Sequence, residues 1–260
     1  MARQGGDGKT RMRPHLPPRP KRPKSERMKL TIIQTGDVPA PLKPRFGDYP
    51  PMFLRMFSAA GHEFDHESVA IYDGAPFPEI AGLDAVLITG SVAGVYDDYA
   101  WLDPLRAFIR AAYAANTPML GVCFGHQIMA DALGGDVRKS EKGWGMGRHT
   151  YTVAARPAGL EAIPALSIAC SHQDQVIVPP PEAEVFLASE FTPNAGLAYR
   201  NGRAISLQPH PEFTDDYAQA LAEMRRGRAP DAVIDTAIAS LGSPSDSLPT
   251  AAWLGRFLAG

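Results

Sequence analysis

The sequence predicts an α/β protein built on a doubly wound, mostly parallel sheet with helices on both faces. Apolar runs of strand length alternate with longer segments of helical periodicity, which is the rhythm of strand–helix–strand units. The runs 84–90 (DAVLITG) and 118–122 (PMLGV) are continuously apolar, as expected of strands that are covered on both faces. We therefore expect functional residues at the carboxyl ends of strands, in the loops after residues 90, 122 and 208.

The first half of the chain contains the clearest elements. Residues 30–36 (LTIIQTG) form a short, β-branched run that predicts the first strand. Residues 50–61 place apolar side chains at helical spacing and stop at a glycine. In the segment 103–116, Asp103 is expected to cap the start of a helix. The segment 123–135 then predicts a helix that ends on glycines.

Strand-like patterns dominate the second half as far as residue 208, and Asn201-Gly202 predicts a tight hairpin turn between two of the strands. Helical patterns return after residue 214 and continue towards the end of the chain. We expect residues 28–260 to form a single domain in which residues 228–260 are a C-terminal helical extension.

The net charge of −2 hides an asymmetry between the two ends of the chain. Residues 1–27 carry nine Lys or Arg and a local balance of about +7, whereas the remainder carries about −9. The acidic body offers no charge-based argument for nucleic acid binding. The tail is rich in Pro and Gly, so we expect it to be disordered. We favour the interpretation that Met28 opens the first strand and that the tail comes from a misassigned start or is a dispensable extension. The alternative is a basic arm for nucleic acid or an anionic surface.

Neither a secretory signal nor a membrane span is expected. The first residues lack an apolar signal core, and the chain has no apolar run of about 18 residues. Two cysteines do not make a disulfide framework. We therefore expect a soluble, cytoplasmic protein with reduced thiols and no membrane contact.

Cys123 lies in the pattern Gly121-Val122-Cys123-Phe124-Gly125, directly after an apolar run and before a helical one. This G-x-C-x-G form is typical of a nucleophile elbow, in which a strand turns sharply into a helix. The free amides at a helix N-terminus favour the thiolate, which is the reactive form of the side chain. The alternative is a small apolar cysteine buried in the turn. We interpret Cys170, which lies in the apolar run LSIAC, as a residue of the core.

His210 is the best candidate for a base that serves this cysteine. It lies in ISLQPHPEF, at the end of a strand-like run, and Glu212 follows two residues later. Residues two apart lie on the same face of extended chain, so the carboxylate can orient the imidazole and stabilise its protonated form. The alternative is a polar loop in which His210 makes ordinary hydrogen bonds and has no catalytic role.

The stretches GVCFGHQ and QPHPE together resemble the class I glutamine amidotransferases over roughly residues 29–215. The resemblance implies a flavodoxin-like α/β sheet and a Cys-His-Glu triad made of Cys123, His210 and Glu212. It further implies that Cys123 attacks the γ-carbonyl of glutamine or of another γ-glutamyl compound. A γ-glutamyl thioester then forms and is hydrolysed, while His210 transfers protons.

The same resemblance suggests further site residues. The loop 88–98 occupies the place where the family builds half of its oxyanion hole. The candidate donors are the backbone amides of Gly90 or Ser91, since the family's Gly-Gly-Pro is replaced here, and of Phe124. Substrate contacts are expected from Gln127, one helical turn after the cysteine, and from His172 and Gln173 in a family-like S-H-x-D-x-V segment. Ordinary polar groups at a strand edge are the alternative for the last two.

Three functional hypotheses remain open from the sequence. The favoured one is a glutaminase that releases glutamate and ammonia for a synthetase partner in trans, because the chain resembles the glutaminase part of GMP synthetase and contains no ATP-binding motif. The second is a γ-glutamyl peptidase with the same chemistry and a larger leaving amine. The third is a non-catalytic regulatory protein. PfpI-like proteases are a more distant alternative. We expect no cofactor, and no Cys/His spacing suits a metal.

Overall fold

The computed structural model describes residues 27–154, 160 and 163–260. Residues 1–26, and with them the expectation of a disordered basic tail, lie outside the described residues. None of the helices that the structure describes combines the length and the apolar character that crossing a bilayer requires.

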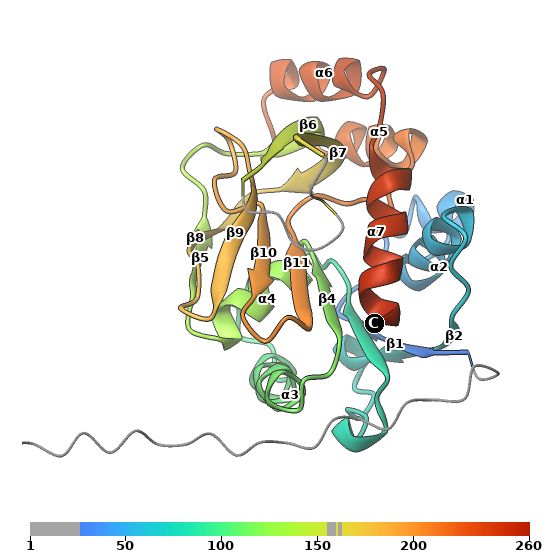
Figure 1. The fold of residues 1–260 in the computed structure, drawn as a ribbon. Coiled ribbons are helices and arrows are strands. Elements are labelled where there is room, and N and C mark those ends of the chain that lie inside the picture. Colours follow the sequence, from blue (N-terminus) through green and yellow to red (C-terminus); the bar gives the residue numbers. More distant parts are fainter. Residues whose placement is uncertain (1–26, 155–159, 161–162) are drawn as a thin grey trace, which may run out of the picture.

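A nine-stranded sheet forms the centre of the molecule, in the order β2-β1-β3-β4-β11-β10-β9-β6-β7 (Figure 1). Its parallel half contains β2 (Asp65–Ala70), β1 (Lys29–Gln34), β3 (Ala85–Ile88), β4 (Met119–Val122) and β11 (Ala204–Leu207). Its antiparallel half contains β10 (Gly196–Tyr199), β9 (Ala183–Ala188), β6 (Gly145–Val153) and β7 (Ala165–His172). A separate antiparallel pair consists of β5 (Asp136–Lys139) and β8 (Asp174–Val178).

Helices cover both faces of the parallel half, which confirms the α/β class. The helices are α1 (Lys43–Phe46), α2 (Tyr49–Ala59), α3 (Leu102–Ala114), α4 (Phe124–Ala132), α5 (Asp215–Glu223), α6 (Asp231–Ser240) and α7 (Ser247–Ala259), with short 3-10 turns at Ile71–Asp73 and Ile80–Gly82. Neighbouring residues of β1 point to opposite faces: Ile32 packs in the core under α2 and α7, and Ile33 in the core under α3 and α4 (Figure 1). The continuous apolar runs of the central strands follow from this double coverage.

The chain ends in a helix that is part of this core. Trp253, Leu254 and Leu258 of α7 are at most 2% exposed, and Trp253 contacts Phe186 of β9 edge-to-face. Burial of such large apolar side chains is the main source of folding free energy. The segment after α5 therefore contributes to the packing of the sheet.

Two local expectations need correction. The helix α3 begins at Leu102 with Trp101 at its N-cap, so Asp103 lies inside the first turn. Its carboxylate accepts a hydrogen bond from Arg106 one turn later, at 2.8 Å, instead of capping the backbone. The hairpin between β10 and β11 forms as expected, but its turn is longer than the expected two residues: residues 200–203 connect the strands.

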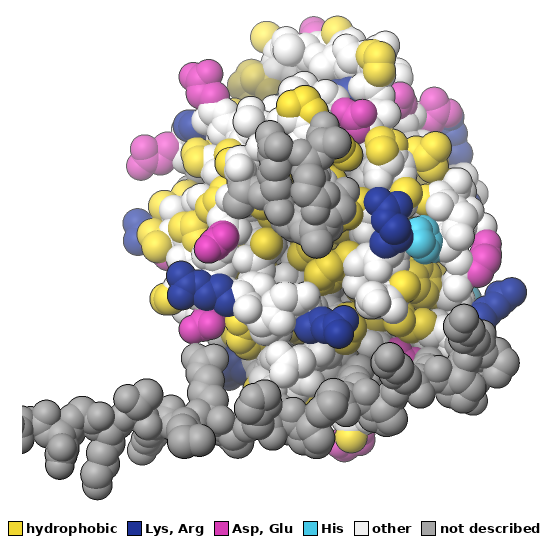
Figure 2. Space-filling view, viewed as in Figure 1, with side chains coloured by type: hydrophobic (Ala, Val, Ile, Leu, Met, Phe, Trp, Pro, Cys, Tyr) yellow, Lys and Arg dark blue, Asp and Glu magenta, His cyan; other side chains and the backbone are white. Residues whose placement is uncertain are grey.

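The surface carries charges of both signs. On the face shown in Figure 2, Lys and Arg side chains are interspersed with Asp and Glu. Among the described residues on that face, no continuous basic stripe of the kind that follows a nucleic acid backbone is present.

A substitution at Gly125 tests how closely α4 packs against the sheet. A Cβ atom at this position would lie 2.2 Å from the carbonyl oxygen of Ile88, and backbone cannot move aside cheaply. We expect Gly125→Ala to lower the free energy of unfolding by about 1–3 kcal/mol, as overpacked cores do. The urea midpoint of unfolding measures this loss. Gly82→Ala is the matched control, because a Cβ there meets no atom within 4 Å. Equal midpoints for the two variants would contradict the packing described here.

Candidate active site

Cys123 occupies a sharp turn between β4 and α4. Its backbone has φ 54° and ψ −106°, a conformation that is strained for a residue with a side chain. The turn is held on both sides, because the Cys123 amide donates to Leu207 at 2.8 Å and the Gly125 amide donates to Thr89 at 3.1 Å. Gly121 also has no room for a side chain, since a Cβ there would lie 2.4 Å from the Gly125 carbonyl. This is the geometry of a nucleophile elbow.

His210 and Glu212 lie in the loop between β11 and α5. The His210 amide donates to the carbonyl of Ala169 at 2.8 Å, which fixes the loop against β7. The ring nitrogen Nδ1 of His210 lies 2.6 Å from Oε1 of Glu212. Phe213 stacks on the imidazole with a centroid separation of 3.8 Å. Both partners of the pair are buried, at 3% and 5% exposure, so the carboxylate is shielded from water.

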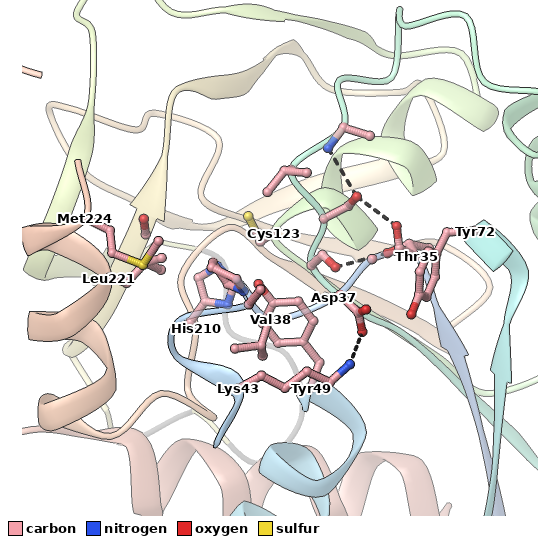
Figure 3. Close-up of a pocket in the computed structure, with 18 of the residues that line it drawn as sticks. Thr35, Asp37, Val38, Lys43, Tyr49, Tyr72, Cys123, His210, Leu221 and Met224 are labelled. Carbon is pink, nitrogen blue, oxygen red and sulfur yellow. Dashed lines mark hydrogen bonds and ion pairs between the residues drawn. The ribbon is translucent and has the colours of Figure 1, made fainter. Parts of the chain in front are cut away.

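Cys123 and His210 come together beside Gly90. A Cβ atom at Gly90 would lie 3.1 Å from Cε1 of His210 and 3.7 Å from Cβ of Cys123. Figure 3 shows the sulfur of Cys123 next to the imidazole of His210, with both at the same cavity. The structure thus brings the pair of His210 and Glu212 to Cys123, which lies 87 residues before His210 in the sequence.

The charges of these groups favour a protonated His210. Burial by itself lowers the pKa of His210, but attraction to Glu212 and Cys123, together with hydrogen bonds to both, raises it to about 10. An imidazolium beside a sulfur stabilises the thiolate form of that sulfur. The arrangement can therefore hold a nucleophile and a proton donor at the same time.

The loop after β3 lies on the other side of the cysteine. Ser91 Oγ donates to the carbonyl of Thr35 at 2.8 Å and accepts from the amide of Ala93 at 3.1 Å. Thr35 Oγ1 in turn donates to the carbonyl of Gly90 at 3.1 Å. Figure 3 shows this chain of bonds around Thr35. The loop is thereby braced against the end of β1.

The backbone amides expected to hold an oxyanion are unoccupied by protein acceptors. Within the described chain, the amides of Gly90, Ser91 and Phe124 donate to no other residue. Gly90 and Ser91 line the same cavity as the sulfur, and Phe124 is the first residue of α4. Free amides beside a nucleophile are what a developing oxyanion requires.

The three side chains expected to contact substrate lie beside the cavity and do not line it. Gln127 is 3% exposed, and its amide nitrogen donates to the carbonyl of Asp174 at 2.9 Å and to Gln208 at 3.1 Å. His172 is 4% exposed with Nδ1 3.1 Å from the same carbonyl, and burial lowers its pKa to about 3. Gln173 uses its carbonyl to accept from the amide of Ser140. In this structure these residues are therefore bound to other parts of the protein and do not face the cavity.

The cavity in front of Cys123 has a volume of about 620 Å³. Its walls include charged and aromatic residues that the sequence did not single out, namely Asp37, Lys43, Tyr49, Tyr72, Arg225 and Arg228. Asp37 comes from the loop at the carboxyl end of β1, and Lys43 begins α1 shortly after it. The rule that sites lie at the carboxyl ends of parallel strands could have found this region. No pattern in the sequence pointed to the two arginines, which follow α5.

One wall of the cavity carries a network of opposite charges. Lys43 Nζ lies 2.8 Å from Asp37 and 3.1 Å from Asp48. The hydrogen bond from Lys43 lowers the pKa of Asp37. Burial and the neighbouring Asp37 raise the pKa of Tyr72 to about 12, so its hydroxyl stays protonated and can donate. Among the described residues, no group of three or more His, Cys, Asp or Glu side chains is arranged to hold a metal ion.

Residues 53–221 match the family model Glutamine amidotransferase class-I. The chain therefore belongs to the class-I glutamine amidotransferase family. A crystal structure of a glutamine amido transferase from Methylobacillus Flagellatus has a TM-score of 0.70 at 21% identity, with 90% of this chain and 93% of that chain covered. At that identity the likeness concerns the fold alone.

Curated relatives of the chain carry more than one functional name. Gamma-glutamyl peptidase 5 of Arabidopsis thaliana is 29% identical over 184 residues, which are 67% of this chain and 72% of that protein. The glutamine-hydrolyzing GMP synthase of Thermus thermophilus is 30% identical over 168 residues, which are 64% of this chain and 32% of that protein. The match to YLR126C of Saccharomyces cerevisiae, at 32% identity, spans 55% of this chain and 60% of that protein.

The charge of Glu212 should control the titration of His210. Because the folded-state pKa lies above the ordinary value of about 6.5, protonated His210 stabilises the fold fully below that pH. This stabilisation is lost as the pH rises through about 10. We expect Glu212→Gln to lower the pKa of His210, so that the loss is complete at a lower pH. An NMR titration of protein carrying carbon-13-labelled histidine measures the change.

The matched control for this titration is Glu184→Gln. Glu184 is an exposed residue of β9 that has no place at the site. Its replacement should leave the His210 titration where it is in the unmodified protein. An unchanged His210 pKa in Glu212→Gln would contradict the ion pair as the cause of the raised value.

Proposed function

We propose that the protein hydrolyses the γ-amide bond of glutamine or of other γ-glutamyl compounds through a covalent thioester on Cys123. The observation that carries this proposal is the arrangement of Cys123, His210 and Glu212, with the imidazole buried between a thiol and a carboxylate. A nucleophile, a proton carrier and an orienting carboxylate are the parts that acyl transfer requires.

In the first half of the proposed reaction, the Cys123 thiolate attacks the γ-carbonyl carbon and a carbon–sulfur bond forms. The negative charge moves to the carbonyl oxygen, where the amides of Phe124 and of Gly90 or Ser91 stabilise it. Collapse of this intermediate breaks the carbon–nitrogen bond. His210 gives its proton to the departing amine, which leaves as ammonia or as a larger amine.

In the second half, water replaces the amine in front of the thioester. His210, now neutral, takes a proton from the water as the hydroxyl attacks the same carbonyl carbon. The carbon–sulfur bond breaks, glutamate leaves, and the thiolate–imidazolium pair is restored. Throughout the reaction, Glu212 holds Nδ1 of His210 and stabilises the imidazolium.

The size of the cavity favours a leaving group larger than ammonia. About 620 Å³ is in the range of sites for drug-sized ligands and exceeds the needs of free glutamine. The Arabidopsis thaliana relative named as a gamma-glutamyl peptidase supports the same direction. We therefore place γ-glutamyl compounds ahead of free glutamine, in contrast to the order that the sequence suggested.

The release of ammonia for a synthetase partner is the second candidate. It is supported by the GMP synthase relative, of which this chain matches 32%. Both candidates place the protein in the cytoplasm, where a nucleophilic thiol stays reduced. In both, residues 28–260 act as a single domain. The free amides and the paired His210 do not favour a purely regulatory role, because such a role requires neither feature.

Cys123→Ala should abolish turnover and leave the fold intact. The variant removes only the sulfur, and Ala needs no more room than Cys. We expect ammonia release from L-glutamine and cysteinylglycine release from glutathione to fall below detection, with an unchanged circular dichroism spectrum. Cys170→Ala, which removes a buried thiol of β7 that does not line the cavity, is the control that retains activity. Full activity in Cys123→Ala would refute the mechanism.

The choice between the two candidates rests on relative rates. We expect kcat/KM for a γ-glutamyl peptide such as glutathione to exceed kcat/KM for L-glutamine by about tenfold or more, which corresponds to about 1.4 kcal/mol of extra transition-state binding. Steady-state assays of both substrates with the same preparation measure the ratio. A preference for glutamine would reverse the order and direct attention to a synthetase partner.

A further inference from the structure

Arg225 lies on the wall of the Cys123 cavity without an acidic partner. It follows Met224, the C-cap of α5, and Leu221 of the same helix lines the same cavity. Its Nε atom is buried and has no hydrogen-bond partner. In the part of the chain that the structure describes, no carboxylate forms an ion pair with it. A buried guanidinium donor without an acceptor is costly unless a ligand supplies one.

The neighbouring Arg226 shows the contrast. Its guanidinium pairs with Glu223 at 2.6 Å, with Asp235 at 2.8 Å and with Asp231 at 3.4 Å. It does not line the cavity. Two adjacent arginines therefore differ in a way that matters for function: Arg226 is neutralised by the protein, and Arg225 is available to a ligand.

Trp144 holds Arg225 in place. The Cζ atom of Arg225 lies 3.9 Å from the centroid of the Trp144 ring, at a distance typical of a cation–π contact. Trp144 belongs to the loop that precedes β6, in the segment 142–147 (KGWGMG). A stack of this kind uses the flat face of the guanidinium and leaves its N–H edge free for a planar acceptor.

Other charged groups of the cavity already have partners in the protein. Lys43 is paired with Asp37, and His210 with Glu212. Arg228 also lines the cavity and adds a second positive charge. A partly enclosed cavity with uncompensated positive charge concentrates anionic ligands.

We infer that Arg225 binds a carboxylate of the γ-glutamyl substrate and that Trp144 positions it. This inference rests on the proposed function and extends it to the recognition of charge. Every γ-glutamyl compound carries an α-carboxylate, and a γ-glutamyl peptide carries a second one on its leaving amino acid. Both are planar acceptors that match the two-pronged edge of a guanidinium. Leu221 and Met224, which lie on one side of Cys123 in Figure 3, line the same cavity as Arg225 and contribute apolar surface to it.

The test measures binding in the full-length Cys123→Ala protein, so that no turnover is needed. Calorimetric titrations use three probes: L-glutamine, γ-glutamylglycine and γ-glutamylglycinamide, which lacks the second carboxylate. We expect Arg225→Gln to raise Kd by about tenfold or more for a probe whose carboxylate it binds, as the loss of a charged hydrogen bond does. Arg226→Gln is the matched control and should leave every Kd unchanged.

The pattern across the probes identifies the carboxylate. Weaker binding of all three probes assigns Arg225 to the α-carboxylate, and weaker binding of γ-glutamylglycine alone assigns it to the leaving amino acid. Unchanged Kd values for all three, or no binding of any probe before the substitution, would overturn the inference. We expect Trp144→Leu to raise Kd several-fold. Trp144→Phe, which preserves the stack, should keep Kd near the value before substitution. If Kd were unchanged in both variants, Trp144 would have no part in positioning Arg225.

These binding results are independent of catalysis. If the unmodified enzyme turned over none of the substrates while Arg225 still governed Kd, the proposed hydrolysis would fail and the carboxylate site would stand. If turnover were normal and Arg225→Gln bound all probes as before, the hydrolysis would stand and the carboxylate site would fail.

Discussion

The close approach of α4 to strands β3 and β4 is the constraint on which the site depends. Gly121 and Gly125 let the helix and the strands meet at backbone distance, with no side chain between them. The chain can make this connection only through a sharp turn, and the residue at the turn, Cys123, takes a positive φ. The thiol is thereby held in front of the helix N-terminus, where backbone amides favour negative charge.

A buried charge balance then completes the site. His210 lies between Cys123 and Glu212, and it is stacked on Phe213 so that water has little access to it. Burial of an imidazolium is unfavourable by itself, but attraction to Glu212 and Cys123 overcomes this cost and raises the pKa of His210. The strained elbow and the buried charges both destabilise the fold. The parallel half of the sheet compensates for this cost, because the loops that carry the site follow its strands β3, β4 and β11.

Chemistry and recognition occupy different parts of the fold. The proposed reacting groups follow the ends of parallel strands, whose residues are buried. The walls of the cavity come from the loop 35–43 and from the end of α5, which lie outside the strands. Changes in these walls can alter the size and charge of the accepted substrate without disturbing Cys123 or His210. This separation is consistent with the finding that proteins named as a peptidase and as a synthase are both similar in sequence to this chain.

Some of these features were determined by the sequence alone. The double-covered strands, the elbow at Cys123 and the pairing of His210 with Glu212 depend on short-range patterns, and each could be predicted from residues a few positions apart. Other features were decided only by the tertiary structure. Gln127 shares the helix of the nucleophile, yet its amide is bound by Asp174 and Gln208 and does not reach the cavity. Such partners come from distant segments of the chain, so no local sequence pattern predicts them.

The walls of the cavity show the same limit. Arg225 and Arg226 are equivalent in the sequence, both within the run MRRGR. The fold places Arg226 among three acidic side chains and Arg225 between Trp144 and the cavity. The sequence determined the identity of the reacting groups, because the chemistry needs particular residues at a fixed local spacing. The tertiary structure decided which charges face the substrate, because a charge is cancelled or left free by neighbours that only folding brings near.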